Sequence, residues 1–492
     1  MTTSPPSLPS AFKSRVEYTE REAYRLLPFH FLRLDNGRVL LTNMVGEFTV
    51  LSTECFETFC EGTLEKSNVA FKELLAKHMV MEPNDSTPIE LLNIKVQNRV
   101  QSVADFTGLH IFVVTLRCDH SCQYCQVSRQ NADVGSFDMS KEHADIALGW
   151  VFKSPNQHIK IEFQGGESLL NFELIKHVVT KANQLNGLYK KEIQFVIATN
   201  LVFLNDEMLQ FASQTGICFS TSLDGPADLH NANRPRPDRN SFELAIAGIN
   251  RVRAELGYDR VSALMTTTHR SLPEVERIVD TYLQHGFNGI FLRPLSPFGF
   301  ATKTKLFNKY NQREWLDFYE KGMNYIIELN RVGIPMQEFY TTILLRKMLT
   351  PYGTGYVDLQ NPSGSAIGAV VFNYDGKVFA SDEGRMLAET DDQALRIGDL
   401  DKDTYESTFG GSNLIDMLQT TMLECSPMCS DCAYQHWCGV DIAHHVATQG
   451  DLMGHKAFSS FCARHMGMFR SIIDRMEQDA FARQLFLSWA WR

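Results

Sequence analysis

Residues 111–125 read IFVVTLRCDHSCQYC, an apolar run that leads into three closely spaced cysteines. The run IFVVTL has the length and the β-branched content of a buried strand, so we expect Cys118, Cys122 and Cys125 to lie on the loop that follows a strand. A four-iron cubane needs four ligands, and an electron-transfer cluster normally takes four thiolates. Three thiolates leave one iron open to a non-protein ligand. The spacing therefore predicts a [4Fe-4S] cluster with an open coordination position.

Five more strand candidates follow this one, separated by segments of helical character. They span residues 158–163, 193–198, 217–222, 261–267 and 289–293. Parallel strands joined by helices close into full or partial barrels, whose chemistry lies on the loops at the carboxyl ends of the strands. The pattern predicts an α/β fold with a partial (β/α)6 barrel, open on the side where a large substrate could enter.

Polar and glycine residues do follow these strands, as such a barrel requires. They are Cys118, Gly165, Gly166, Glu167, Thr199, Asn200, Asp224, Gly225, Arg293 and Pro294. Five of the six strands, all but 261–267, therefore place these residues at one edge of the predicted barrel.

The C-x3-C-x2-C loop and the segment FQGGE (163–167) resemble the radical S-adenosyl-L-methionine (SAM) superfamily over about residues 108–310. The resemblance implies that the open iron binds SAM and that an electron from the cluster cleaves it to a 5'-deoxyadenosyl radical. It also implies that the SAM-binding residues are Tyr124, Gly165, Gly166, Glu167, Asn200, Ser222, Asp224 and Arg234.

Among these residues, Tyr124 would lie near the adenine, and Glu167 or a backbone carbonyl would accept from the SAM amino group. The glycines would let the backbone approach the ligand closely. Arg234 would pair with a carboxylate. Packing over the cluster is the alternative for Tyr124, and a solvent-facing position is the alternative for Arg234.

A second group of cysteines lies in CSPMCSDCAYQHWC (425–438), with Cys462 further on. This pattern resembles the C-terminal SPASM domain of radical SAM peptide maturases. The resemblance implies one auxiliary [4Fe-4S] cluster on four ligands, which are Cys429, Cys432, Cys438 and Cys462. The family's other auxiliary cluster should be absent, because Ser381 and Ile442 replace two of its cysteines. Four thiolates could instead hold zinc, and Cys425 is a surplus thiol.

Asp382 follows Ser381 directly. It matches the aspartate that accepts a proton in sulfatase-maturating relatives, which implies a catalytic role. An aspartate next to a turn is also ordinary structure, and that reading stays open.

The N-terminal region predicts three short antiparallel strands from Phe29 onward, with a hairpin turn at Asn36-Gly37. Two helices should follow, the first capped by Ser52 or Thr53. This small winged-helix-like α+β unit resembles the precursor-recognition element of ribosomal-peptide-modifying enzymes, in which a peptide adds to a sheet edge. A simple packing domain is the alternative.

At 492 residues the chain should fold as two or three domains. We expect a flexible tail at 1–22, the winged-helix-like domain at 23–95, the radical SAM partial barrel at 106–310, bridging helices at 311–345, the SPASM-like domain at 346–465 and a C-terminal helix at 466–492. Residues 91–107 are predicted to be variable.

Composition and charge argue against several classes of function. The net charge of -11 argues against a nucleic-acid partner. The sequence lacks a signal peptide and a run of about 20 apolar residues, so we expect a cytoplasmic protein without a membrane partner. Eleven cysteines, mostly in two clusters, indicate metal binding rather than a disulfide framework. Cys55, Cys60 and Cys218 are expected to be small buried hydrophobes.

The combined resemblance is to radical SAM/SPASM peptide maturases, and the opening segment is most similar to the His-Xaa-Ser system radical SAM maturase. It implies hydrogen abstraction from a side chain of a ribosomally made precursor peptide, giving a crosslink or an oxidation, with an electron donor such as flavodoxin or ferredoxin. One alternative is an anaerobic sulfatase-maturating enzyme that forms formylglycine. Another is an iron-sulfur electron-transfer or redox-sensing protein.

Overall fold

The computed structural model describes residues 23–132 and 135–491, so the predicted tail at 1–22 lies outside the described residues. The chain divides into two compact units. One holds the described residues up to Arg99 together with Asp431–Ala433, and the other holds Val100–Ser430 and the residues from Tyr434 onward. Within the described chain, every helix falls short of the length and apolar character needed to cross a bilayer.

The first unit contains the three antiparallel strands that the sequence predicts, in the order β2-β3-β4. The predicted helices follow, and Ser52 caps the first by accepting a hydrogen bond from the Cys55 amide. A short antiparallel pair, β1-β5, completes the unit. The bounds are β1 (Arg25–Leu26), β2 (Phe29–Arg33), β3 (Arg38–Asn43), β4 (Phe48–Ser52), α1 (Thr53–Glu61), α2 (Val69–Ala76) and β5 (Val80–Met81).

Helix α3 (Thr87–Gln101) occupies most of the stretch that the sequence left as variable. Only Pro88 and Leu92 of this helix are buried. A helix with so little buried surface carries a weak apolar periodicity, which explains why the sequence did not predict this helix.

The second unit is built on an eight-stranded sheet of order β10-β9-β8-β7-β6-β13-β14-β15. Strands β6 to β10 are parallel, as predicted, and the α/β fold with a partial-barrel sheet is confirmed. The bounds are β6 (Leu109–Thr115), β7 (His158–Gly165), β8 (Glu192–Ala198), β9 (Cys218–Ser222), β10 (Val261–Leu264), β13 (Ala369–Phe372), β14 (Lys377–Phe379) and β15 (Arg396–Asp399).

The sixth predicted strand differs from expectation. Within 289–293 only β11 (Gly289–Ile290) is extended, and it pairs with β12 (Gln337–Glu338) in a separate sheet. The segment still meets the end of β10, because the Thr267 amide donates to the Arg293 carbonyl at 2.8 Å. The Leu292 amide instead donates to the buried carboxylate of Glu338, which takes this backbone out of the main ladder.

Strand β13 takes the place beside β6. Its four residues AVVF are all buried and run parallel to Leu109–Phe112. Residues from the predicted SPASM-like region therefore extend the sheet of the barrel.

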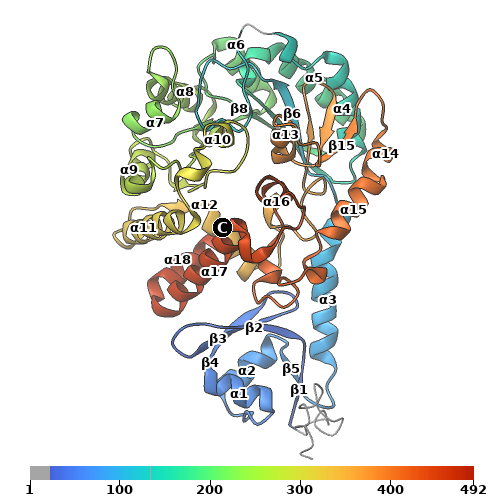
Figure 1. Ribbon diagram of the computed structural model, residues 1–492, viewed down its shortest axis with the longest axis vertical. Coiled ribbons are helices and arrows are strands. Elements are labelled where there is room, and N and C mark those ends of the chain that lie inside the picture. Colours follow the sequence, from blue (N-terminus) through green and yellow to red (C-terminus); the bar gives the residue numbers. More distant parts are fainter. Residues whose placement is uncertain (1–22, 133–134, 492) are drawn as a thin grey trace, which may run out of the picture. The chain divides into compact units, whose positions relative to one another are not determined.

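Helices α4, α5, α6 and α8 lie around the outside of the sheet (Figure 1). The helices up to α9 are α4 (Lys141–Lys153), α5 (Phe172–Tyr189), α6 (Asp206–Thr215), α7 (Ala227–Asn233), α8 (Ser241–Leu256) and α9 (Val275–Gln284). The later ones are α10 (Phe300–Lys303), α11 (Gln312–Arg331), α12 (Phe339–Leu349), α13 (Asp382–Ala388), α14 (Tyr405–Phe409), α15 (Ser412–Thr420), α16 (Ile442–Gln449), α17 (Ser460–Gln478) and α18 (Ala480–Ala490).

The chain ends in two helices where the sequence predicted one over 466–492. Helix α17 stops at Gln478, and Asp479 caps α18 by accepting from the amides of Phe481 and Ala482. An aspartate favours this N-cap conformation over the helix interior, which accounts for the break.

Candidate active site

The first cysteine group lies on the loop after β6, where the sequence predicted it. The Cys118 amide donates to Gln130 O at 3.1 Å, and the Cys125 amide donates to Cys122 O at 3.1 Å. The Phe300 amide donates to Cys125 O at 2.8 Å. Backbone bonds to its own residues and to α10 therefore hold the three-cysteine loop.

Gly165 and Gly166 place the end of β7 directly against this loop. A Cβ on Gly165 would lie 1.9 Å from Thr115 O, and one on Gly166 would lie 2.3 Å from Arg117 O. Gly165 also has φ of +140°. The Gly166 amide donates to Thr115 O at 2.8 Å. In this structure the glycines let backbone approach backbone, whereas the sequence had suggested only the approach of backbone to a ligand.

Glu167 is fully buried at the same edge. Its Oε1 accepts from the Leu169 amide at 3.0 Å and from Thr199 Oγ1 at 2.5 Å, and its Oε2 accepts from the Asn200 amide at 2.7 Å. Burial raises the pKa of Glu167 to about 7, although these bonds oppose the rise. The carboxylate joins the ends of β7 and β8, which leaves a backbone carbonyl as the better candidate for the SAM amino group.

The thiols of the loop suit an iron cluster. Cys118, Cys122 and Cys125 are all free thiols. Burial raises the pKa of Cys122 to about 12, and burial together with the charge of Glu167 raises that of Cys118 well above its ordinary value. Such thiols ionise only when a cation compensates for lost hydration, and iron supplies that positive charge. The donor set therefore fits a [4Fe-4S] cluster.

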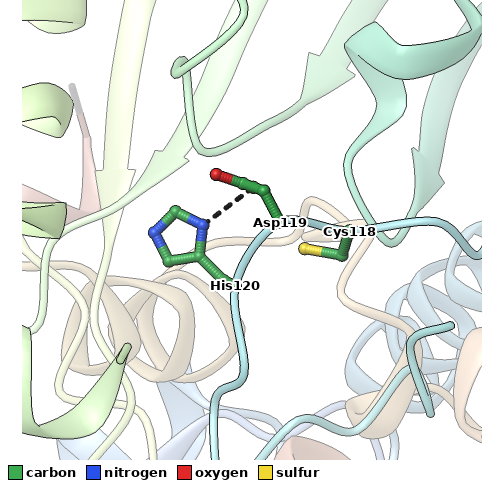
Figure 2. A group of neighbouring side chains, drawn as sticks. All are labelled: Cys118, Asp119 and His120. Carbon is green, nitrogen blue, oxygen red and sulfur yellow. Dashed lines mark hydrogen bonds and ion pairs between the residues drawn. The ribbon is translucent and has the colours of Figure 1, made fainter. Parts of the chain in front are cut away.

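Asp119 and His120, between the cysteines, went unnoticed in the sequence. Their ligand atoms and the Cys118 sulfur lie within 4.8 Å of one another, a spacing compatible with one metal ion (Figure 2). Both side chains already have partners, however. His120 Nδ1 lies 2.9 Å from Asp119 Oδ1, His120 Nε2 lies 2.7 Å from Ser241 Oγ, and Asn200 Nδ2 donates to Asp119 Oδ1 at 2.7 Å. This network ties the loop to β8 and α8 and favours a positioning role for Asp119 and His120.

Tyr124, Asp224 and Arg234 are brought together. The Tyr124 hydroxyl donates to Asp224 Oδ2 at 2.6 Å, and Arg234 Nε donates to the same oxygen at 3.1 Å. The guanidinium also lies 5.4 Å from the centre of the Tyr124 ring. Arg234 is mostly buried, which contradicts a solvent-facing position, and its carboxylate partner here is Asp224. Ser222 ends β9 and is half-buried.

The second cysteine group lies against a buried core. Cys429 and Cys438 pack on the apolar cluster that contains Leu423 and Val440. Lys456 is 8% exposed. Burial lowers the pKa of Lys456, while the nearby thiols of Cys429, Cys462 and Cys438 raise it, so all three sulfurs lie near one ammonium group.

Cys432, the fourth predicted auxiliary ligand, belongs to the stretch Asp431–Ala433 of the first unit. The complete four-thiolate site, whether for iron or zinc, stays a prediction.

Asp382 is the first residue of α13. Arg385 Nε lies 3.4 Å from its Oδ1. Burial raises the pKa of Asp382 to about 6, and the Arg385 charge opposes that rise. A carboxyl group with such a pKa can exchange a proton near neutral pH.

Known proteins resemble parts of this chain. Residues 112–282 match the Radical SAM superfamily. An uncharacterized protein of Methanocaldococcus jannaschii is 29% identical over 38% of this chain and 62% of its own length. A cysteine-type anaerobic sulfatase-maturating enzyme of Clostridium perfringens is 24% identical over 47% of this chain and 64% of that enzyme. This chain thus matches somewhat less than two thirds of each of these two relatives.

Solved structures share the fold at low sequence identity. Native anSMEcpe with bound AdoMet superposes with a TM-score of 0.62 at 17% identity, covering 77% of this chain and 100% of that chain. Streptococcus suis SuiB bound to precursor peptide SuiA gives a TM-score of 0.52 at 13% identity, covering 89% of this chain and 99% of that chain. The chain therefore carries a radical SAM domain at residues 112–282, within a fold that it shares with anSMEcpe and SuiB.

Proposed function

We propose that this chain is a radical SAM enzyme that abstracts hydrogen from a peptide side chain and so matures a ribosomally made precursor. The observation that carries this proposal is the loop after β6, on which three free thiols are held by the backbone of the Gly-Gly-Glu segment. When bound, a [4Fe-4S] cluster with one open iron supplies the electron that cleaves SAM to a 5'-deoxyadenosyl radical.

The chain's own residues would bind and orient the cosubstrate. Asp224 at the end of β9 pairs with Arg234 at the end of α7, and Asn200 at the end of β8 donates to Asp119. These paired groups would shape the edge at which SAM binds. Glu167 would fix the separation of these strand ends, since its carboxylate is committed to internal bonds. A fixed edge of this kind positions reacting groups without reorganisation during the reaction.

The peptide substrate is supported by two neighbours of the fold. An anSMEcpe structure contains AdoMet and the Cp18Cys peptide, and a SuiB structure contains the precursor peptide SuiA. We further propose that the maturase is of the His-Xaa-Ser type and that Cys429, Cys432, Cys438 and Cys462 hold one auxiliary cluster. A flavodoxin or ferredoxin would deliver the electrons.

Sulfatase maturation is the second candidate. The similarity to the Clostridium perfringens enzyme supports it, as does the position of Asp382 with its raised pKa. In that reaction a carboxylate would take up a proton while a Cys or Ser of the sulfatase is oxidised. A sulfatase-derived peptide would then be modified in place of a precursor peptide.

The proposal is tested by anaerobic reconstitution with iron and sulfide, followed by SAM and dithionite. We expect 5'-deoxyadenosine from the parent protein and none from Cys122→Ala, which should also lose one cluster's worth of iron. Cys218→Ala, the same substitution on β9 outside the loop, is the matched control and should behave like the parent. Intact clusters in the parent without 5'-deoxyadenosine would instead support an electron carrier or redox sensor.

A further inference from the structure

Arg385 on α13 is an arginine that the fold keeps out of water. Its side chain is 1% exposed, and it is among the largest fully buried side chains of the described residues. A buried guanidinium is costly unless carboxylates and hydrogen-bond acceptors compensate for its lost hydration. The partners of Arg385 therefore indicate what its buried charge serves.

The guanidinium contacts two segments that lie far apart in the sequence. Its Nη1 donates to Val127 O at 3.3 Å, and its Nε donates to Asp382 Oδ1 at 3.4 Å. Val127 is the second residue after Cys125, on the loop that carries the three cysteines. Asp382 is the first residue of α13, which lies beside the sheet and contacts β13, β14 and β15 (Figure 1). One side chain thus connects the cysteine loop with the proposed proton acceptor.

Apolar contacts already join these two segments. The Val127 side chain packs on the apolar cluster that includes Met386 and Leu387 of α13. It also packs on a second apolar cluster, which includes Leu116 and which Ala388 of α13 contacts as well. Replacing a buried ion pair by apolar residues is often neutral or even stabilising. Attachment of α13 to the loop therefore does not require a charged side chain at position 385, and the charge indicates a role beyond packing.

Charged groups face Asp382 from three parts of the chain. Arg385 and Glu383 belong to α13, Glu162 belongs to β7, and Arg293 follows β11. Burial raises the pKa of Asp382 to about 6, and the two neighbouring carboxylates add to the rise. The charges of both arginines oppose it, and that of Arg385 has the larger effect. Without Arg385 the Asp382 carboxyl group would keep its proton to a higher pH.

A second carboxylate shares the same guanidinium. Glu389 Oε1 lies 3.8 Å from Arg385 Nη1. Burial raises the pKa of Glu389, and burial raises the pKa of Tyr374 to about 12, while the Arg385 charge opposes both rises. Asp382 and Glu389 therefore compete for one cation, so a change at Glu389 can strengthen the Arg385–Asp382 pair without altering either member.

We infer that Arg385 is a positioning residue, which pairs with Asp382 and holds this carboxylate, in its ionised form, at a fixed place relative to the cysteine loop. A carboxyl group that already holds a proton cannot accept another, so Asp382 needs this partner to act as a proton acceptor at neutral pH. The inference rests on the proposed function, in which Asp382 takes up a proton from the substrate.

The pKa of Asp382 can be measured by infrared difference titration of the reconstituted full chain. The carbonyl band of its protonated carboxyl group is assigned by its loss in Asp382→Asn, made in the parent and in each variant. Arg385→Gln keeps a donor for Val127 O but removes the charge, and it should raise the pKa of Asp382 by about 1–3 pH units.

Arg385→Lys separates the charge from the geometry. Lysine keeps the positive charge but lacks the planar fork that reaches two partners at once. The pKa of Asp382 should therefore stay close to that of the parent, whereas the first cluster should lose its iron to a chelator several-fold faster.

The matched control is Arg396→Gln, which removes a guanidinium that pairs with Asp399 at 2.6 Å on β15. It should leave both the pKa of Asp382 and the release of iron unchanged. Glu389→Gln should lower the pKa of Asp382, because it leaves the guanidinium to Asp382 alone. Circular dichroism melting shows whether Arg385→Gln folds, and Glu389→Gln decides if it does not.

An unchanged pKa of Asp382 in the deciding variant would overturn the inference, as would parent-like iron release in Arg385→Lys. A pKa raised equally in Arg385→Lys and Arg385→Gln would also overturn it. Assaying 5'-deoxyadenosine on the same preparations separates the two ideas. A parent that cleaves SAM but whose Asp382 pKa is independent of Arg385 overturns the inference alone. A parent that shows the dependence but leaves SAM intact overturns the proposed reaction and supports the positioning of Asp382 by Arg385.

Discussion

Gly166→Ala isolates the contact between the Gly-Gly-Glu segment and the cysteine loop. The new Cβ would lie 2.3 Å from Arg117 O and 2.5 Å from Leu116 O, and both are backbone atoms that cannot turn aside as a side chain would. Only movement of the loop can relieve these contacts. Overpacking of this kind costs about 1–3 kcal/mol, and we expect the upper half of that range because two carbonyl groups are affected.

The expected result is a protein with lower unfolding free energy in urea and without the iron of the first cluster, while the second cysteine site stays loaded. The control is Gly149→Ala on α4, where an added Cβ meets nothing within 4 Å. That substitution should raise stability by about 0.5–1 kcal/mol, since alanine favours the helix. If the two variants matched in iron content and in stability, the argument that backbone contact requires Gly166 would be wrong.

Three further substitutions test other parts of the site. Asp382→Asn should leave SAM cleavage intact but stop peptide modification. Burial raises the pKa of Asp382 to about 6, so the folded state holds this proton more tightly than the unfolded state. The parent should therefore lose unfolding free energy relative to Asp382→Asn as the pH rises from about 4 through about 6. Parallel pH profiles of the two proteins in urea titrations would contradict this. Cys438→Ala should lower iron content while uncoupled 5'-deoxyadenosine formation continues, and bound zinc with unchanged iron would correct the assignment of the metal. Glu167→Gln should cost about 1–3 kcal/mol in urea unfolding, since an amide group cannot accept at both oxygen positions that serve Thr199 and Asn200; an unchanged midpoint would show that these bonds are dispensable.

The sequence predicted the parallel strands and the cysteine loop because both have strong local signals. Runs such as IFVVTL bury both faces and read as strands without further information, and the cysteine spacing is carried by eight consecutive residues. The N-terminal hairpins were equally local, since turn residues separate their strands.

The same reasoning could not predict which strands pair when they lie far apart in the sequence. The short segment AVVF lies about 250 residues after β6. Its four apolar residues do not indicate that it pairs with Leu109–Phe112. The predicted strand at 289–293 shortened because the buried carboxylate of Glu338 bonds to the Leu292 amide. Side-chain partners of this kind depend on tertiary structure.

The sequence identified which residues lie at the site, but it did not predict which contacts each of them makes. Tyr124, Asp224 and Arg234 were each assigned to SAM, and the structure joins them in one buried group. Asp119 and His120 were missed because they belong to no recognisable motif; they are polar residues that lie between two cysteines of the motif.

The pairing of β13 with β6 has a consequence for how the chain can be cut. Without the residues from 369 onward, β6 would become an outer strand whose main-chain amides and carbonyls face open solvent. Outer strands of this kind, long and apolar, recruit other chains and aggregate. The cysteine loop would then follow an unprotected outer strand, so we expect that the C-terminal quarter cannot be removed without exposing β6.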